Sequence, residues 1–142
     1  MTGNKPTQQG FTLLMAVLTS SVLLAIGAAI GSIAIKEAIL TTSIRDSQKA
    51  FYAADAALEC ALYWDITRGE FNNPNPNITC SGENPLINKS GTVYTFALDF
   101  GDDGCANVRI DKDSTTEIET RGYNTCDSNS SRRLERGLRA EY

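Results

Sequence analysis

The chain has 142 residues, with 13 basic and 17 acidic side chains and a formal net charge of −4. This length allows one long helix and one small globular domain, and the acidic balance differs from the basic face of a dedicated nucleic-acid-binding protein. Because the chain has no histidine and no C-x-x-C spacing among its four cysteines, it lacks the usual catalytic base and a zinc-binding pattern. We therefore expect no enzymatic activity, no cofactor and no metal site.

The N-terminal sequence predicts a membrane-spanning helix behind a short leader. Residues 1–10 are mostly polar and carry a positive charge, whereas residues 11–35 contain no charged residue and no proline. At about 1.5 Å of rise per residue, this run can cross a hydrocarbon core of about 30 Å, and it is too long for a secretory signal peptide. Lys36 and Glu37 cancel each other after the run, so the N-terminus is expected in the cytoplasm and the C-terminal domain outside.

Two glycines in this run are candidates for helix packing. Gly27 and Gly31 are four residues apart, and small residues at this spacing allow helices to approach closely in lipid. Glycine is also frequent in membrane helices in general. The pattern therefore leaves open whether the pair serves an interface or only reflects membrane composition.

The helix is predicted to continue through residues 36–68. No proline or glycine interrupts it before Gly69, and a glycine at this position is a common C-terminal stop. Apolar or small residues recur every three or four positions, which predicts an amphipathic half with one face covering a sheet. The members of this predicted stripe are Leu40, Ile44, Ser47, Phe51, Ala54, Leu58 and Leu62.

The junction between the leader and the apolar helix reads Gly10-Phe11-Thr-Leu-Leu, and it resembles the class III leader of type IV pilins and pseudopilins. The resemblance implies that a prepilin peptidase cuts after Gly10 and methylates the new N-terminal Phe11. It also implies that residues 11–35 are first a membrane anchor in lipid. They then pack with the helices of other pilin subunits in a filament.

A second resemblance and one departure favour a minor subunit. The segment KAFYAADAALE, residues 49–59, is similar to the A-x-Y-A-A-[DE]-A-G-x-E stretch of PilX-type minor pilins and large tip-forming minor pseudopilins. Ala57 stands where glycine is common in that stretch. Most pilins also have a glutamate four residues after the first phenylalanine, where this chain has Met15. Subunits without that glutamate tend to be minor ones, so Met15 argues against a major repeating subunit.

Residues 69–142 predict an extracellular β domain. Residues 69–91 have the composition of a long loop, and the sequence that follows alternates with a period of two in four short segments. We expect an α+β, pilin-like fold in which one long helix packs on an antiparallel sheet of about four strands. The residues predicted to face inward are Tyr94, Phe96, Leu98 and Phe100, then Ala106, Val108 and Ile110, then Ile118, Thr120 and Gly122, and last Leu134, Arg136, Leu138, Ala140 and Tyr142.

The four cysteines are expected to form two disulfides, because the domain lies outside the membrane. Cys80 could tie the long loop to Cys60 near the end of the helix. Cys105 and Cys126 are our preferred second pair, although the predicted hairpin places Cys105 opposite Gly122 and requires a bulge or an irregular strand end. Four cysteines allow three connectivities, and the sequence does not settle which one forms.

Two functions follow from the sequence. The first is a structural minor pilin or pseudopilin subunit of a type IV pilus or a type II secretion-like filament, in the membrane at first and on the cell surface after assembly. The second is a single-pass, membrane-tethered binding module that does not assemble. A filament subunit would begin at Phe11, whereas a plain anchor would keep Met1.

Overall fold

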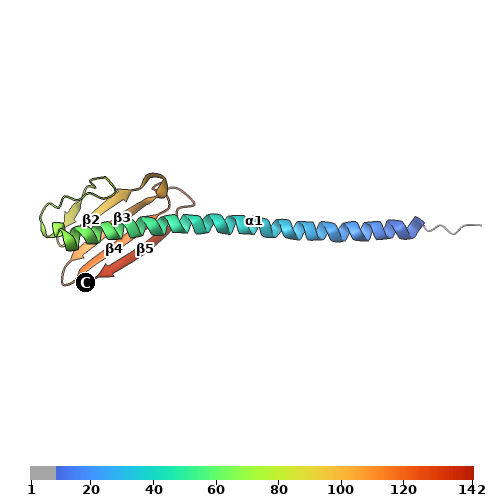
Figure 1. Cartoon of the computed structure of the whole chain (residues 1–142), viewed down its shortest axis with the longest axis horizontal. Helices are drawn as coiled ribbons and strands as arrows, with labels where there is room; N and C mark the ends of the chain where they lie inside the picture. The colour runs from blue at the N-terminus through green and yellow to red at the C-terminus, as the bar shows by residue number, and fades with distance from the viewer. Residues whose placement is uncertain (1–8) are drawn as a thin grey trace, which may run out of the picture. The chain divides into compact units, whose positions relative to one another are not determined.

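In the computed structural model, described here for residues 9–142, the chain has an α+β fold of one long helix and one antiparallel sheet (Figure 1). Residues 1–8, which include most of the predicted leader, lie outside the described part. The helix α1 covers Gln9–Leu62. The chain divides into two compact units, one that extends to Thr42 and one formed by Ser43–Tyr142.

The first unit contains the uncharged part of α1. Every side chain in residues 11–42 is exposed, and by length and composition the helix can cross a membrane. Its hydroxyl groups donate hydrogen bonds to backbone carbonyl oxygens of the same helix. Thr19 donates to the carbonyl oxygen of Met15 at 2.9 Å, and Ser32 donates to that of Ala29 at 2.8 Å. Such bonds satisfy polar groups inside the helix, as a lipid environment requires.

The second unit contains a five-stranded antiparallel sheet in the order β1-β2-β3-β4-β5. The strands are β1 (Asn88–Ser90), β2 (Val93–Asp99), β3 (Cys105–Lys112), β4 (Thr116–Tyr123) and β5 (Glu135–Glu141). The sequence predicted about four strands, and β1 lies within the predicted loop. All three residues of β1 are exposed, so it has no alternation of apolar and polar side chains by which it could be recognised.

The predicted alternation is confirmed in the three central strands. Tyr94, Phe96 and Leu98 of β2, Ala106, Val108 and Ile110 of β3, and Ile118, Thr120 and Gly122 of β4 are all buried on the inner face. β5 is an edge strand, and its Leu138 and Ala140 are only half-buried. The inner face is therefore most deeply buried in the three central strands, β2 to β4.

The helix covers this face with alanines. Ala50, Ala54, Ala57 and Ala61 are fully buried, whereas Ile44 and Phe51 of the predicted stripe are 59% and 44% exposed. The prediction of the buried face was therefore wrong in part. The reason is Gly122: a Cβ there would lie 2.9 Å from the Cβ of Ala54, and closer still to the carbonyl oxygen of Ala50 and the amide nitrogen of Ala54. Only small residues fit where the helix backbone comes this close to β4.

The segment after the helix completes the core. A π-helical turn, η1 (Tyr63–Thr67), continues α1, and Gly69 then ends it in the left-handed conformation at φ 64°, as expected from the sequence. The predicted loop is more ordered than its composition indicated. It contains the short helix η2 (Glu70–Asn72) and buries Phe71 and Ile78 to 1% exposure. The loop thus supplies two of the largest core side chains.

The contact at Gly122 predicts a strong position dependence for the same substitution. Gly122→Ala should lower the free energy of unfolding by about 1–3 kcal/mol, because the added methyl group meets helix backbone that cannot move independently. Gly137→Ala on the neighbouring strand is the control, since the nearest atom lies 3.7 Å from its added Cβ, and its effect should stay within about 0.5 kcal/mol. Urea unfolding of the full chain in detergent, followed by the fluorescence of the single tryptophan, Trp64, measures both. Equal effects would contradict the close approach.

Candidate functional site

The predicted processing and packing residues lie on an exposed helix surface. Phe11 is 69% exposed and Met15 is 48% exposed, and a Cβ added at Gly27 or Gly31 would have no neighbour within 4 Å. The two glycines therefore make no close contact within the chain, and their role as helix-packing residues stays a prediction. The side chains of Phe11 and Met15 offer apolar contact on this surface.

A disulfide joins Cys60 of α1 to Cys80 of the loop, with the two Cα atoms 6.0 Å apart. This is the pairing suggested for the loop from the sequence. Trp64 reinforces it by donating its indole N–H to the carbonyl oxygen of Thr79 at 3.0 Å. A tight turn with backbone bonds of 2.9 Å in both directions between Cys80 and Glu83 follows. The helix end and the loop are therefore fixed to each other.

The second expected disulfide is absent, and Cys105 and Cys126 are free thiols. The β3–β4 ladder is regular and pairs Cys105 with Tyr123, one residue beyond the predicted partner. No bulge brings Cys126 into line, and its thiol instead donates to Asp99 at 3.5 Å. Burial and a hydrogen bond with the Cys105 thiol raise the pKa of Cys126 to about 12. The Cys126 thiol therefore stays protonated at neutral pH and lies beside that of Cys105.

A buried carboxylate, which the sequence analysis did not identify, joins three distant parts of the second unit. The side chain of Asp65 in η1 is 1% exposed, and Lys112 of β3 contacts its two oxygens at 2.7 and 2.9 Å. The hydroxyl group of Tyr142 donates a short hydrogen bond to the same carboxylate. The three residues are 30 to 77 positions apart, so no local pattern could have revealed them. Their shared role is to fix the end of the helix against the sheet.

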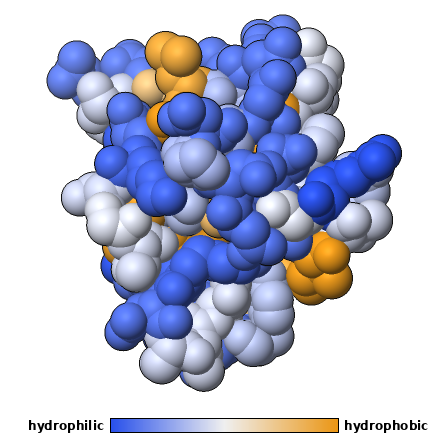
Figure 2. Space-filling view, turned by 90° about the vertical axis from the view of Figure 1, so that its left-hand side faces the viewer, coloured by the Kyte–Doolittle hydropathy of each residue, from blue (hydrophilic) through white to orange (hydrophobic). Residues whose placement is uncertain are grey.

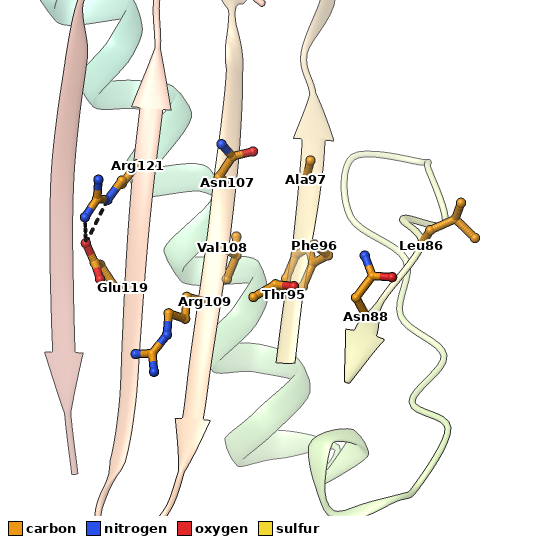
Figure 3. A pocket seen from close by; sticks show the side chains of 10 residues that line it. All are labelled: Leu86, Asn88, Thr95, Phe96, Ala97, Asn107, Val108, Arg109, Glu119 and Arg121. Carbon is orange, nitrogen blue, oxygen red and sulfur yellow. Dashed lines mark hydrogen bonds and ion pairs between the residues drawn. The ribbon is translucent and has the colours of Figure 1, made fainter. Parts of the chain in front are cut away.

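The outer face of the sheet carries a shallow hollow of about 590 Å³ (Figure 3). Its floor is made of small or polar side chains from β2 and β3, and its rim includes Arg121 on one side and Leu86, which is 89% exposed, on the other. The lining residues named in Figure 3 are Leu86, Asn88, Thr95, Phe96, Ala97, Asn107, Val108, Arg109, Glu119 and Arg121. Amides, hydroxyls and guanidinium groups together could bind a polar ligand.

The charges around this hollow are paired on the protein. Arg121 contacts Glu119 at 2.8 Å, which together with Glu135 raises its pKa, and Arg109 contacts Asp111 at 2.7 Å. These exposed pairs contribute little to stability, but they leave the hollow without a strong net charge. A highly charged ligand is therefore not favoured there.

The C-terminal arginines do not form one basic patch. Arg136 donates to the hydroxyl group of Ser47 on α1 at 2.7 Å, Arg139 pairs with Glu117 at 2.9 Å, and Arg133 lies 3.8 Å from the ring centre of Tyr123. These three arginines therefore contact three different neighbours.

The end of the molecule shown in Figure 2 is mainly hydrophilic, with a few separate hydrophobic spots. Within residues 9–142, no group of three or more cysteine, aspartate or glutamate side chains is arranged to hold a metal ion.

The Tyr142–Asp65 bond predicts a loss of stability in alkaline solution. Burial and the neighbouring carboxylate raise the pKa of Tyr142 above its ordinary value of 10.0, because the neutral phenol is the form that the fold stabilises. This contribution is complete below about pH 10 and is lost as the pH rises from there through the pKa of the folded state. In Tyr142→Phe, stability at neutral pH should fall by about 1–2 kcal/mol, and the decline above pH 10 should become shallower.

The measurement is urea unfolding of the full chain at a series of pH values from 7 to 11. Tyr52→Phe is the matched control, because Tyr52 is 65% exposed and lies outside the cluster. If the two variants have the same pH profile as the parent chain, the bond to Asp65 does not stabilise the fold.

The cysteine arrangement predicts a thiol count. Maleimide added to the chain under denaturing but non-reducing conditions should modify Cys105 and Cys126 and leave Cys60 and Cys80 unmodified. Peptide mass spectrometry identifies the labelled residues. Modification of none of the four would show that the second disulfide forms, as the sequence analysis preferred. Labelling of Cys60 or Cys80 would contradict the disulfide in the structure.

No family model, no curated protein and no solved structure matches this chain.

Proposed function

We propose that the chain is a structural subunit of the pilin type, a minor pilin or pseudopilin of a type IV pilus or a type II secretion-like filament. One observation carries the proposal: an uncharged and wholly exposed stretch of α1, residues 11–35, starts directly after Gly10. A compact domain follows on the same helix. This order provides a membrane anchor, an assembly element and a presented domain in one chain.

The assembly step needs no catalytic group in this chain. A prepilin peptidase, the first partner, removes residues 1–10 and methylates Phe11. The helix then moves from lipid into a bundle with the helices of other pilin subunits. Both environments are apolar, so the transfer changes little in the hydrophobic free energy, and helix association relies on close packing of small residues such as Gly27 and Gly31.

Met15 bears on the position of the subunit in a filament. A glutamate at this place would be costly in the bilayer unless it met a partner. The apolar side chain of Met15 has no such cost and forms no ion pair with a neighbouring N-terminus. A subunit of this kind can join a filament without supplying the charge that repeating subunits share, which supports a minor role.

The expected location follows from the same features. The chain would cross the inner or cytoplasmic membrane once with its N-terminus inside, and the C-terminal domain would lie outside before and after assembly on the cell surface. The Cys60–Cys80 disulfide is consistent with this placement, since disulfides persist outside the cytoplasm.

The outer hollow favours a second candidate, a membrane-tethered binding module. Its polar floor and exposed Leu86 could hold a ligand without any filament. The two candidates differ in processing, because a tethered module has no need to lose its leader.

Intact-mass measurement of the chain from membranes that contain a prepilin peptidase tests the proposal. The parent chain should begin at methylated Phe11, whereas Gly10→Val should keep residues 1–10 because the cleavage site is lost. Gly3→Val is the matched control and should be processed normally. A parent chain that retains Met1 would refute the filament subunit and leave the tethered module.

A further inference from the structure

The outer hollow lies over two neighbouring rows of side chains on the outer face of the sheet (Figure 3). Each row crosses the strands through the register of their pairing. The first row is Asn88, Thr95, Arg109 and Glu119, and the second is Ala97, Asn107 and Arg121. Because Thr95 and Ala97 on β2 are short, they leave a space between the longer side chains on either side of that strand.

Two polar side chains of the first row have no partner on the protein. Within residues 9–142, the amide group of Asn88 and the hydroxyl group of Thr95 form no hydrogen bond. The two residues are paired across β1 and β2 and both line the hollow, so one molecule above the sheet can contact both. Each side chain provides a donor and an acceptor. The hollow therefore contains two adjacent hydrogen-bonding groups that the fold does not use.

The charged side chains of the hollow also place donors beside acceptors. Arg121 pairs with Glu119 at 2.8 Å, and Arg109 pairs with Asp111 at 2.7 Å. A guanidinium group has five N–H donors, and these contacts use only some of them. Because each arginine already has an acidic partner, a phosphate or carboxylate ligand would have to compete with that partner. The pairs therefore favour a neutral ligand that both donates and accepts hydrogen bonds.

We propose that the outer hollow binds a neutral saccharide. Neighbouring hydroxyl groups of a sugar ring each donate and accept, which matches the amide, hydroxyl and paired guanidinium groups of the two rows. Leu86 is 89% exposed at the other side of the hollow, and its side chain offers apolar contact to the C–H face of a sugar ring. The inference goes beyond the proposed function, since binding on the sheet requires neither processing after Gly10 nor assembly.

A peptide strand fits this site less well than a saccharide does. A peptide that binds beside a sheet uses the free backbone groups of an edge strand along several residues. The edge strand at the hollow, β1, has only three residues, and short edge strands limit such pairing. The groups available to a ligand are therefore the polar side chains on the face of the sheet.

The test measures binding of the full chain to an array of immobilised glycans, in a detergent without sugar such as dodecylphosphocholine. The array carries neutral oligosaccharides of glucose, galactose, mannose and N-acetylhexosamines, together with sialylated and sulfated forms. We expect binding to neutral glycans, with no gain from the added acidic groups. The neutral glycan that binds best is then titrated into the nitrogen-15-labelled chain. The backbone amide signals of Thr95 and Asn107 should shift, whereas that of Ser128, which is exposed outside the hollow, should not.

Three variants locate the site. Ala97→Phe should lower the affinity for this glycan by about tenfold or more, because the ring fills the space over β2. Ala56→Phe is the matched control, since Ala56 is also exposed but lies on α1 and lines a different hollow, and its affinity should stay within about twofold of the parent chain. Asn88→Ala removes an amide that the fold does not use and should weaken binding by about three- to tenfold. The fluorescence of Trp64 confirms that each variant is folded.

Four results would overturn the inference: no binding to any neutral glycan, binding only to sialylated or sulfated glycans, equal affinities of Ala97→Phe and Ala56→Phe, or binding to a parallel array of neutral peptides in place of glycans. The proposed function fails separately. The variant Gly10→Val, which keeps residues 1–10, should bind the glycan with the affinity of the parent chain, so loss of processing does not change this result.

Discussion

The second unit depends on the close approach of α1 to β4 at Gly122. Because this position has no side chain, the backbone of the helix at Ala50 and Ala54 comes within contact distance of the sheet. Alanines then form the buried side of the helix, and larger residues from elsewhere fill the space around it. Phe71 and Ile78, which follow the helix in the chain, occupy that space and are almost completely buried. The close contact thus decides which residues of the helix are buried and which stay exposed.

The sheet was more predictable from the sequence than the helix face. In β2 and β3, the larger apolar residues recur at every second position, and this pattern favours one choice of inner face. On the helix, Ile44 and Phe51 have the greater hydrophobicity, so the periodicity favoured them over Ala50 and Ala57. The buried side of the helix is instead determined by Gly122, about 70 residues away in the chain. No local pattern contains that information. β1 was not predicted for a similar reason. Only its pairing with β2 identifies it as a strand, because its side chains show no alternation.

The same distinction applies to the candidate sites. The Gly10-Phe11 junction and the cysteine spacing are both local patterns. The junction predicts a processing site, which stays a prediction, and the cysteine spacing suggested the Cys60–Cys80 pair that the structure contains. The Asp65–Lys112–Tyr142 cluster and the outer hollow come from several strands at once. The burial of Asp65, which requires a partner for the carboxylate, is visible only in the structure, so the sequence carried no signal for the cluster. The Cys105–Cys126 bridge was the preferred second pair although it required a bulge or an irregular strand end. The β3–β4 ladder is regular and supplies neither, and both cysteines are free.

The helix α1 has two parts with different sequences, one up to Ile35 and one beyond Ser43. Up to Ile35 it contains no charge, and its hydroxyl groups bond to their own backbone, so lipid and a helix bundle are equally acceptable surroundings. Beyond Ser43 it must bind a sheet on one side, and it does so with the smallest apolar residues. Small residues bury little area each, which is why the disulfide, Asp65 and the loop residues are needed to hold the helix in place. The large apolar residues Phe51 and Tyr52 of this part of the helix then remain exposed on the surface.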